Sequence, residues 1–168
     1  MISAFLSKLL TTRQASFTED EIEIFDLNFT MQPLLSLVEF QEEIKDKKLM
    51  ERLGYLISNA IITHFKRRFA IEEKKIGNLW TKLFNISGIG RVEVVDVTEK
   101  RTVLKLARNN FARLYVEKYG IQKQPVCFLI TGMFKNFIEK TSGKKVEVKE
   151  TSCIASGNKV CTFEVEVV

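Results

Sequence analysis

The sequence predicts an α+β fold in a single domain, residues 1–168, in which an antiparallel sheet made of two hairpins packs against several helices. Three observations favour this class. Residues 91–106 and 146–168 each contain two β-rich runs around a short turn, which is typical of a hairpin. Apolar residues at helical spacing fill much of the remaining chain. A length of 168 residues and a hydrophobic content of 45% suit one domain with a sizeable core.

The N-terminal third is predicted to begin with a weakly amphipathic helical segment, residues 1–16, that packs on the domain or on a partner chain. Residues 22–29 alternate between apolar and polar types, which predicts one strand. Pro33 marks the start of the next helix. Residues 49–69 form the longest predicted helix, with an apolar stripe of Leu49, Leu53, Leu56, Ala60, Phe65 and Phe69.

Residues 76–84 predict a short helix that carries Trp80 and Phe84 on one face. Two strands follow, residues 91–97 and 101–106, joined by Thr98-Glu99-Lys100.

Asn109 or Asn110 is expected to cap the next helix, because asparagine side chains accept hydrogen bonds from the first free backbone N–H groups. The helix predicted from Pro125 to about Lys140 has two apolar stripes, so we expect it to be buried on much of its circumference.

The C-terminal hairpin contains a conflict that one extra residue resolves. Cys161 lies on the apolar face of the second run, whereas Glu150 and Cys153 on the first run have opposite parity. If Thr151 and Ser152 together oppose one residue, Glu150, Cys153 and Cys161 share one face at one end of the hairpin. The predicted pairs are then 146:167, 148:165, 150:163, 153:161 and 155:159, around a Ser156-Gly157-Asn158 loop.

The third cysteine, Cys127, follows Pro125 at the predicted helix start. A thiol at a helix N-terminus has a lowered pKa, which favours the metal-binding thiolate. The three cysteines and Glu150 are therefore a candidate zinc site. Two other interpretations stay open from the residues alone. The cysteines are small buried hydrophobic side chains, or Cys153 and Cys161 form a cross-strand disulfide.

Residues 109–168 resemble the 4-vinyl reductase-like domain, a family of small-molecule-binding modules. The matching residues are Asn109-Asn110-Phe111, Pro125-Val126-Cys127 and Gly132, then Glu150-x-x-Cys153-x-x-x-Gly157-x-x-x-Cys161-x-Phe163-Glu164-Val165. In aromatic-sensing activators that carry this domain, three cysteines and a glutamate hold zinc. The resemblance therefore implies a structural zinc ion on Cys127, Glu150, Cys153 and Cys161. The same fold superfamily includes subunits of the vesicle-tethering complex TRAPP, which dimerise and enclose acyl chains.

What the resemblance implies is a non-catalytic sensor domain for a hydrophobic or aromatic molecule. In the related phenol sensors a histidine and a tryptophan hold the ligand hydroxyl, but the chain's one histidine, His64, and one tryptophan, Trp80, cannot be assigned to that pair. We expect the signal to pass to a separate partner, because this sequence shows no DNA-binding or ATPase motif.

Two alternative functions stay open. The chain could be a scaffold subunit that acts as a homodimer, for which residues 1–16 offer an amphipathic surface. It could also be a reductase-associated protein of tetrapyrrole metabolism, the process that gives the family its name, although no redox cofactor motif is present.

We expect an apolar ligand pocket between the predicted Pro125–Lys140 helix, the short helix with Trp80 and Phe84, and the helix with Phe111 and Tyr115. These helices carry more large rings than one sheet face needs. The candidate lining residues are Trp80, Phe84, Phe111, Tyr115, Ile130, Met133 and Phe134.

Composition narrows the remaining classes. The net charge is +5, and the densest basic run, Lys66-Arg67-Arg68, is typical of a solvated helix end, so no direct nucleic-acid binding is expected. No apolar run reaches the length of a transmembrane helix and no secretory leader is expected. An odd number of cysteines favours a reducing cytoplasm. Recognisable catalytic motifs are absent, and His64 is expected to be structural.

Overall fold

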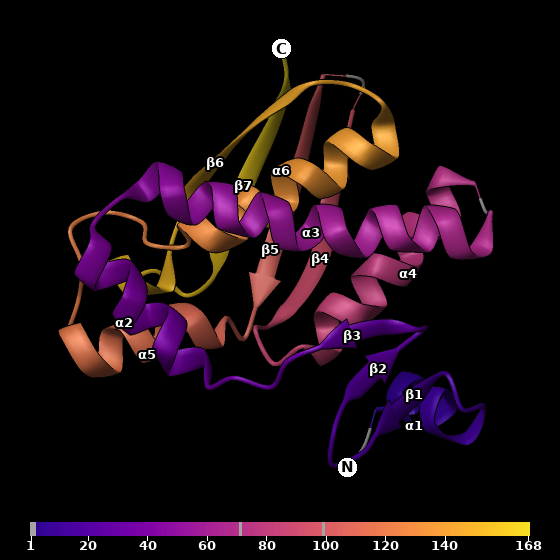
Figure 1. Ribbon diagram of the computed structural model, residues 1–168. Coiled ribbons are helices and arrows are strands. Elements are labelled where there is room, and N and C mark those ends of the chain that lie inside the picture. Colours follow the sequence, from indigo (N-terminus) through magenta and orange to yellow (C-terminus); the bar gives the residue numbers. More distant parts are fainter. Residues whose placement is uncertain (1–2, 71, 99) are drawn as a thin grey trace. The chain divides into compact units, whose positions relative to one another are not determined.

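A computed structural model describes residues 3–70, 72–98 and 100–168 (Figure 1). The chain separates into two compact units, residues 1–33 and residues 34–168. We describe each unit by itself. The predicted α+β class with two antiparallel hairpins is confirmed, whereas the extent of the domain stays a prediction.

The first unit contains α1 (Ala4–Thr11) and a three-stranded antiparallel sheet of β1 (Ala15–Phe17), β2 (Ile22–Ile24) and β3 (Leu27–Phe29). The Ser3 hydroxyl caps α1 by accepting a hydrogen bond from the Leu6 N–H at 3.1 Å. The predicted helix is therefore shorter than residues 1–16, of which Met1 and Ile2 lie outside the described residues.

The prediction of a single strand over residues 22–29 is wrong. Ile24 pairs with Leu27, and the two residues between them, Phe25 and Asp26, have φ values of 55° and 60°. A two-residue turn with both central residues at positive φ matches the twist of an antiparallel hairpin. The alternating pattern hid this turn because no glycine marks it.

The second unit is built on a four-stranded antiparallel sheet in the order β4-β5-β7-β6. Its strands are β4 (Arg91–Val97), β5 (Arg101–Ala107), β6 (Val146–Ser152) and β7 (Cys161–Val167). Both predicted hairpins are present, and β7 joins them because it pairs with β5 as well as with β6. Glu99 of the expected turn between β4 and β5 lies outside the described residues.

The register of the C-terminal hairpin follows the prediction up to the bulge. Val146, Val148 and Glu150 pair with Val167, Val165 and Phe163, and a register shift between Glu150 and Ser152 places Ser152 opposite Thr162. The expected pairs 153:161 and 155:159 are wrong, because β6 ends at Ser152. The short 3-10 helix η1 (Ile154–Ser156) follows, and Gly157 ends it at φ 86°.

The described residues of the second unit form five α-helices: α2 (Leu34–Ile44), α3 (Lys47–Phe69), α4 (Glu73–Ile86), α5 (Asn110–Tyr119) and α6 (Phe128–Ser142). Helix α6 contacts β6 on one side and α3 and α4 on others, so it lies between the sheet and the outer helices (Figure 1). Nearly all of its residues from Leu129 to Phe137 are buried, as its two apolar stripes predict. It begins at Phe128, three residues later than expected, and Cys127 is its N-cap.

The buried face of helix α3 shares only Phe65 with the predicted apolar stripe. Its buried residues are Met50, Gly54, Ser58, Ile62 and Phe65, whereas Leu49 and Leu56 are 48% and 46% exposed. The reason is a close helix crossing. A Cβ atom on Gly54 would lie 1.8 Å from the Leu129 carbonyl oxygen of α6, and one on Gly132 would lie 1.8 Å from the Glu51 carbonyl oxygen of α3. Backbone proximity at two glycines, rather than the number of leucines, therefore decides which face packs.

Candidate metal centre

The four residues of the candidate zinc site converge from three elements. Cys127 caps α6, Glu150 stands beside the bulge of β6, Cys153 follows that strand, and Cys161 begins β7. One ligand atom from each residue lies within 4.8 Å of the other three, and all four residues are buried. The bulge permits this, because it turns Cys153 to the side on which Glu150 already lies.

The sulfur atoms are spaced as a metal would hold them. The Cys127 Sγ atom lies 3.8 Å from Cys153 Sγ and 3.9 Å from Cys161 Sγ, and the last pair is 3.9 Å apart. In a tetrahedral site with Zn–S bonds of about 2.3 Å, the sulfurs lie about 3.8 Å apart. A disulfide needs a separation of about 2 Å, and all three thiols are free. The arrangement fits metal ligation and not the cross-strand disulfide.

Glu150 is the fourth candidate ligand, and only one of its two carboxylate oxygens has a hydrogen-bond partner among the described residues. Its Oε2 atom accepts a hydrogen bond from the Cys127 N–H at 3.0 Å, which ties β6 to the start of α6. Its Oε1 atom is buried and has no hydrogen-bond partner among the described residues. A buried oxygen without a partner destabilises a fold by about 1–3 kcal/mol. A bound cation would remove that penalty.

Asn109 supports the site from α5. Its Nδ2 atom donates to Cys127 Sγ and to Cys161 Sγ, both at 3.1 Å, while its Oδ1 atom accepts from the Ala112 N–H and caps α5. The sequence predicted the capping role. It did not predict the contact with sulfur, since nothing in the local sequence shows that the cysteines meet this helix start. The Ile154 N–H also donates to Cys161 Sγ, at 3.3 Å.

The electrostatics of the cluster favour a cation. Burial raises the pKa of the Cys127 thiol, which corrects the expectation that the helix N-terminus lowers it. Burial likewise raises the pKa of Glu150 to about 8, with the neighbouring Cys153 adding to the effect. Hydrogen bonds from the Cys127 and Cys161 thiols lower the pKa of Cys153. Ionisation of all four buried groups together therefore requires a compensating positive ion.

The residues predicted to line an apolar pocket separate into two groups. Trp80, Phe84 and Phe134 belong to a ring cluster, with ring centroids 5.2 Å apart for Trp80–Phe84 and 5.6 Å apart for Phe84–Phe134. Phe111, Ile130 and Met133 are buried.

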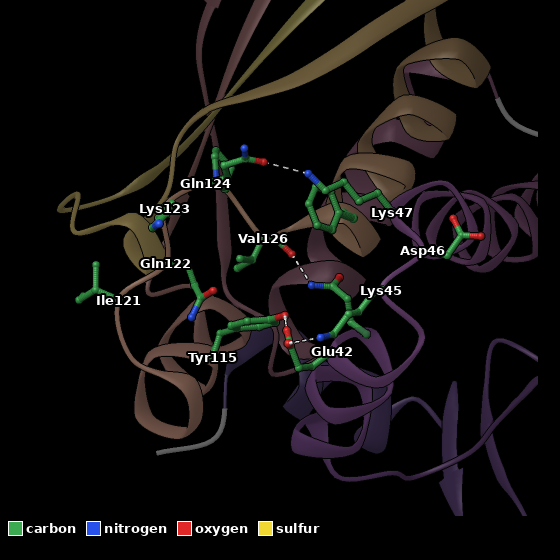
Figure 2. A pocket seen from close by; sticks show the side chains of 13 residues that line it. Glu42, Lys45, Asp46, Lys47, Tyr115, Ile121, Gln122, Lys123, Gln124 and Val126 are labelled. Carbon is green, nitrogen blue, oxygen red and sulfur yellow. Dashed lines mark hydrogen bonds and ion pairs between the residues drawn. The ribbon is translucent and has the colours of Figure 1, made fainter.

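Tyr115 instead lines an open pocket of about 510 Å³ between α2, α5 and the segment before α6 (Figure 2). A role for the seven residues in ligand binding stays a prediction.

Comparison with known protein families finds a match in the C-terminal part of the chain. The family model of the 4-vinyl reductase domain matches residues 108–167, which confirms the resemblance identified from the sequence. No curated protein sequence matches the chain significantly.

Solved structures share the fold at low sequence identity. The phenol-responsive sensory domain of the transcription activator PoxR, solved with phenol, aligns with a TM-score of 0.80 and 16% identity, covering 99% of this chain and 92% of that one. A vinyl-4-reductase family protein from Methanocaldococcus jannaschii aligns with a TM-score of 0.61 and 19% identity, covering 100% and 97%.

A trafficking protein particle complex subunit 3 from Naegleria fowleri, covalently bound to palmitic acid, aligns with a TM-score of 0.56 and 12% identity, covering 80% and 92%. The predicted similarity to TRAPP subunits is thereby confirmed for the fold. Among the described helices, none combines the length and apolar character that a membrane span requires.

Proposed function

We propose that this chain is a non-catalytic small-molecule sensor domain with a structural zinc ion held by Cys127, Glu150, Cys153 and Cys161. The observation that carries the proposal is the buried set of four ligand atoms, all within 4.8 Å of one another. Thiolates select zinc among the common divalent ions of cells. The sensor role is supported by similarity in fold to the sensory domain of PoxR.

A structural role for the metal follows from its surroundings. Four protein ligands fill a tetrahedral zinc shell and leave no position for water or substrate. All three cysteines have no exposed surface. The ion would join α6 to the β6–β7 hairpin, and Asn109 would orient two of its sulfur ligands. These features support binding rather than catalysis.

The proposed ligand is hydrophobic or aromatic and occupies the interior beside α4, α5 and α6. The rings there already touch, with the Trp80 and Phe137 centroids 4.3 Å apart and the Phe134 and Phe163 centroids 4.9 Å apart. Entry of a ligand therefore requires the rings to part, and Met133 is the flexible side chain best suited to move. We expect ligand binding to be coupled to a shift of α4 or α6.

A scaffold role as a homodimer is the second candidate, and one observation favours it. Leu49 and Leu56 are about half exposed on α3 and lie two turns apart on the same side, with Leu53 between them. Such a stripe can pack against the same stripe of a second copy.

We further propose that the domain acts through a separate signalling partner. We also propose a cytoplasmic location, because three free cysteines suit a reducing compartment.

Native mass spectrometry of protein purified without chelator tests these proposals together. We expect one zinc ion per chain, a dimer, and a retained apolar molecule or a mass shift on addition of aromatic compounds. Metal-free protein with freely reactive thiols would contradict the zinc site. A metal-loaded dimer that binds no compound from an aromatic and acyl panel would favour the scaffold over the sensor.

A further inference from the structure

A second candidate site lies outside the ring-lined interior, in the open pocket of about 510 Å³ shown in Figure 2. Its wall comes from α2, the junction of α2 with α3, Tyr115 of α5, and residues 121–126. It goes beyond the proposed function, because neither the candidate metal ligands nor the residues of the ring cluster line it. Every residue of its wall belongs to the second unit.

Gln41 is a buried polar residue of the pocket wall and is only 4% exposed. Its Nε2 atom donates to the Val126 carbonyl oxygen at 2.8 Å. Because that partner accepts hydrogen bonds only, the amide cannot be turned around, and Oε1 is the atom left over. Oε1 is buried and has no hydrogen-bond partner among the described residues. Because Gln41 lines the pocket, a hydroxyl or N–H donor that reached Oε1 would satisfy this buried acceptor.

Two neighbouring polar groups interact with Glu42 instead. The Tyr115 hydroxyl donates to Glu42 Oε2 at 2.5 Å, and Lys45 Nζ lies 3.8 Å from the other oxygen of the same carboxylate. Figure 2 shows Tyr115, Glu42 and Lys45 gathered on one part of the wall. The donors of Tyr115 and Lys45 are thus directed to Glu42.

Another part of the wall carries the positive charge of Lys47, which also attracts the Glu51 carboxylate one turn further along α3. Lys47 Nζ donates to the neutral amide oxygen of Gln124 at 3.0 Å and lies 5.0 Å from the centre of the Phe128 ring. Asp46, the nearest acid in sequence, accepts from the Leu49 N–H as the cap of α3. Lys123 is a further cation of the wall, on the far side of Gln124 and Val126 from Lys47 in Figure 2. The Lys47 ammonium suits a carboxylate.

The rest of the wall is apolar, from Ile121, Pro125 and Phe128. We propose that the pocket binds a hydroxycarboxylate with an apolar or aromatic body. Its hydroxyl donates to Gln41 Oε1, its carboxylate meets Lys47, and its body lies against the apolar residues. Gln41, which would accept from the ligand, also donates to Val126, the residue before Cys127.

Isothermal titration of the full chain with three matched probes tests the ligand chemistry. 4-Hydroxybenzoate carries both groups, benzoate lacks the hydroxyl, and phenol lacks the carboxylate. We expect benzoate to bind at least about tenfold more weakly than 4-hydroxybenzoate, because it leaves the buried acceptor unpaired. Equal affinity for benzoate and 4-hydroxybenzoate, or no binding of 4-hydroxybenzoate at millimolar concentration, would overturn the proposal.

Two neighbouring lysine variants test the position. Lys47→Met keeps an apolar stem beside Phe128 and removes the charge, so 4-hydroxybenzoate should bind about tenfold more weakly. Lys48→Met is the control, since Lys48 follows on the same helix turn but lines a different groove. Unchanged affinity in Lys47→Met, or equal losses in both variants, would refute this site. If the affinity for phenol is the same in Lys47→Met as in the parent, phenol binds in the ring-lined interior. The two proposed sites can therefore be refuted independently of each other.

Discussion

Gly54 of α3 and Gly132 of α6 lie at the same helix crossing, each against the backbone of the turn that contains the other. The contacts are reciprocal. A side chain on Gly54 would meet Leu129 and Met133, and one on Gly132 would meet Glu51 and Tyr55. The crossing holds α6 close to α3, and the N-cap of α6 is Cys127 of the candidate metal centre.

Gly54→Ala should therefore destabilise the protein severely. The new Cβ would lie 1.8 Å from a backbone oxygen, which no change of rotamer relieves. We expect a loss of about 3 kcal/mol or more in the free energy of unfolding. Gly77→Ala is the matched control, because its Cβ would meet only side-chain atoms at 3.5 Å or beyond. That variant should gain about 0.5–1 kcal/mol from helix propensity. Equal denaturation midpoints for the two variants would contradict the crossing geometry.

Cys153→Ser should abolish metal binding and lower stability. If zinc saturates the parent at about a thousandfold its dissociation constant, the loss is about 4 kcal/mol. Chelator should lower the melting temperature of the parent and leave that of the variant unchanged. Thr151→Ala, at the exposed bulge, should keep its metal. A variant that melts like the parent, in the same chelator-sensitive way, would remove Cys153 from the ligand set.

Asn109→Ser separates the two roles of Asn109. Serine still caps α5 but cannot donate to both sulfurs, so zinc affinity should fall about 10- to 100-fold. Competition with a chromophoric chelator measures it, and circular dichroism should show unchanged helix content. Asn110→Ser is the control, because the Asn110 amide donates to the Gly88 carbonyl oxygen and not to sulfur. Unaltered affinity in Asn109→Ser would make Asn109 a helix cap only.

Tyr115 should ionise unusually late. Burial, then its hydrogen bond to Glu42, raises the pKa of Tyr115 from 10 to about 12. Because the folded pKa lies above the unfolded one, this group's contribution to stability is fully present below pH 10 and is lost as pH rises through 12. Ultraviolet difference titration of the parent against Tyr115→Phe measures it. Glu42→Gln should shift ionisation to lower pH, whereas the exposed neighbour Glu43→Gln should not.

Sequence reasoning succeeded where one local conflict had one simple solution. The parity of Glu150 against Cys153 required a bulge, and the bulge lies where it was predicted. It failed where packing between segments far apart in the sequence determines which residues are buried. The leucines of α3 outnumber the small residues on the opposite face, yet Gly54 permits the closer packing. Phe25 and Asp26 form a turn that their residue types do not announce.

The residues that support the candidate sites could not be predicted from the sequence, for the same reason. Asn109 contacts sulfur atoms that are 18 and 52 residues away along the chain. Gln41 donates to a carbonyl 85 residues away. Neither contact leaves a local pattern, since amide side chains at a helix start or on a helix are common on their own.

The position of β7 in the sheet has a consequence for how the protein is made. β7 follows β4, β5 and β6 along the chain, yet it lies between β5 and β6. On the ribosome the first hairpin must therefore wait with the edge of β5 open until β7 has emerged. Cys161 arrives in the same stretch, so a nascent chain cannot offer a metal its complete ligand set any earlier. Assembly of the sheet and completion of the candidate metal centre are thus delayed to the same late moment of synthesis.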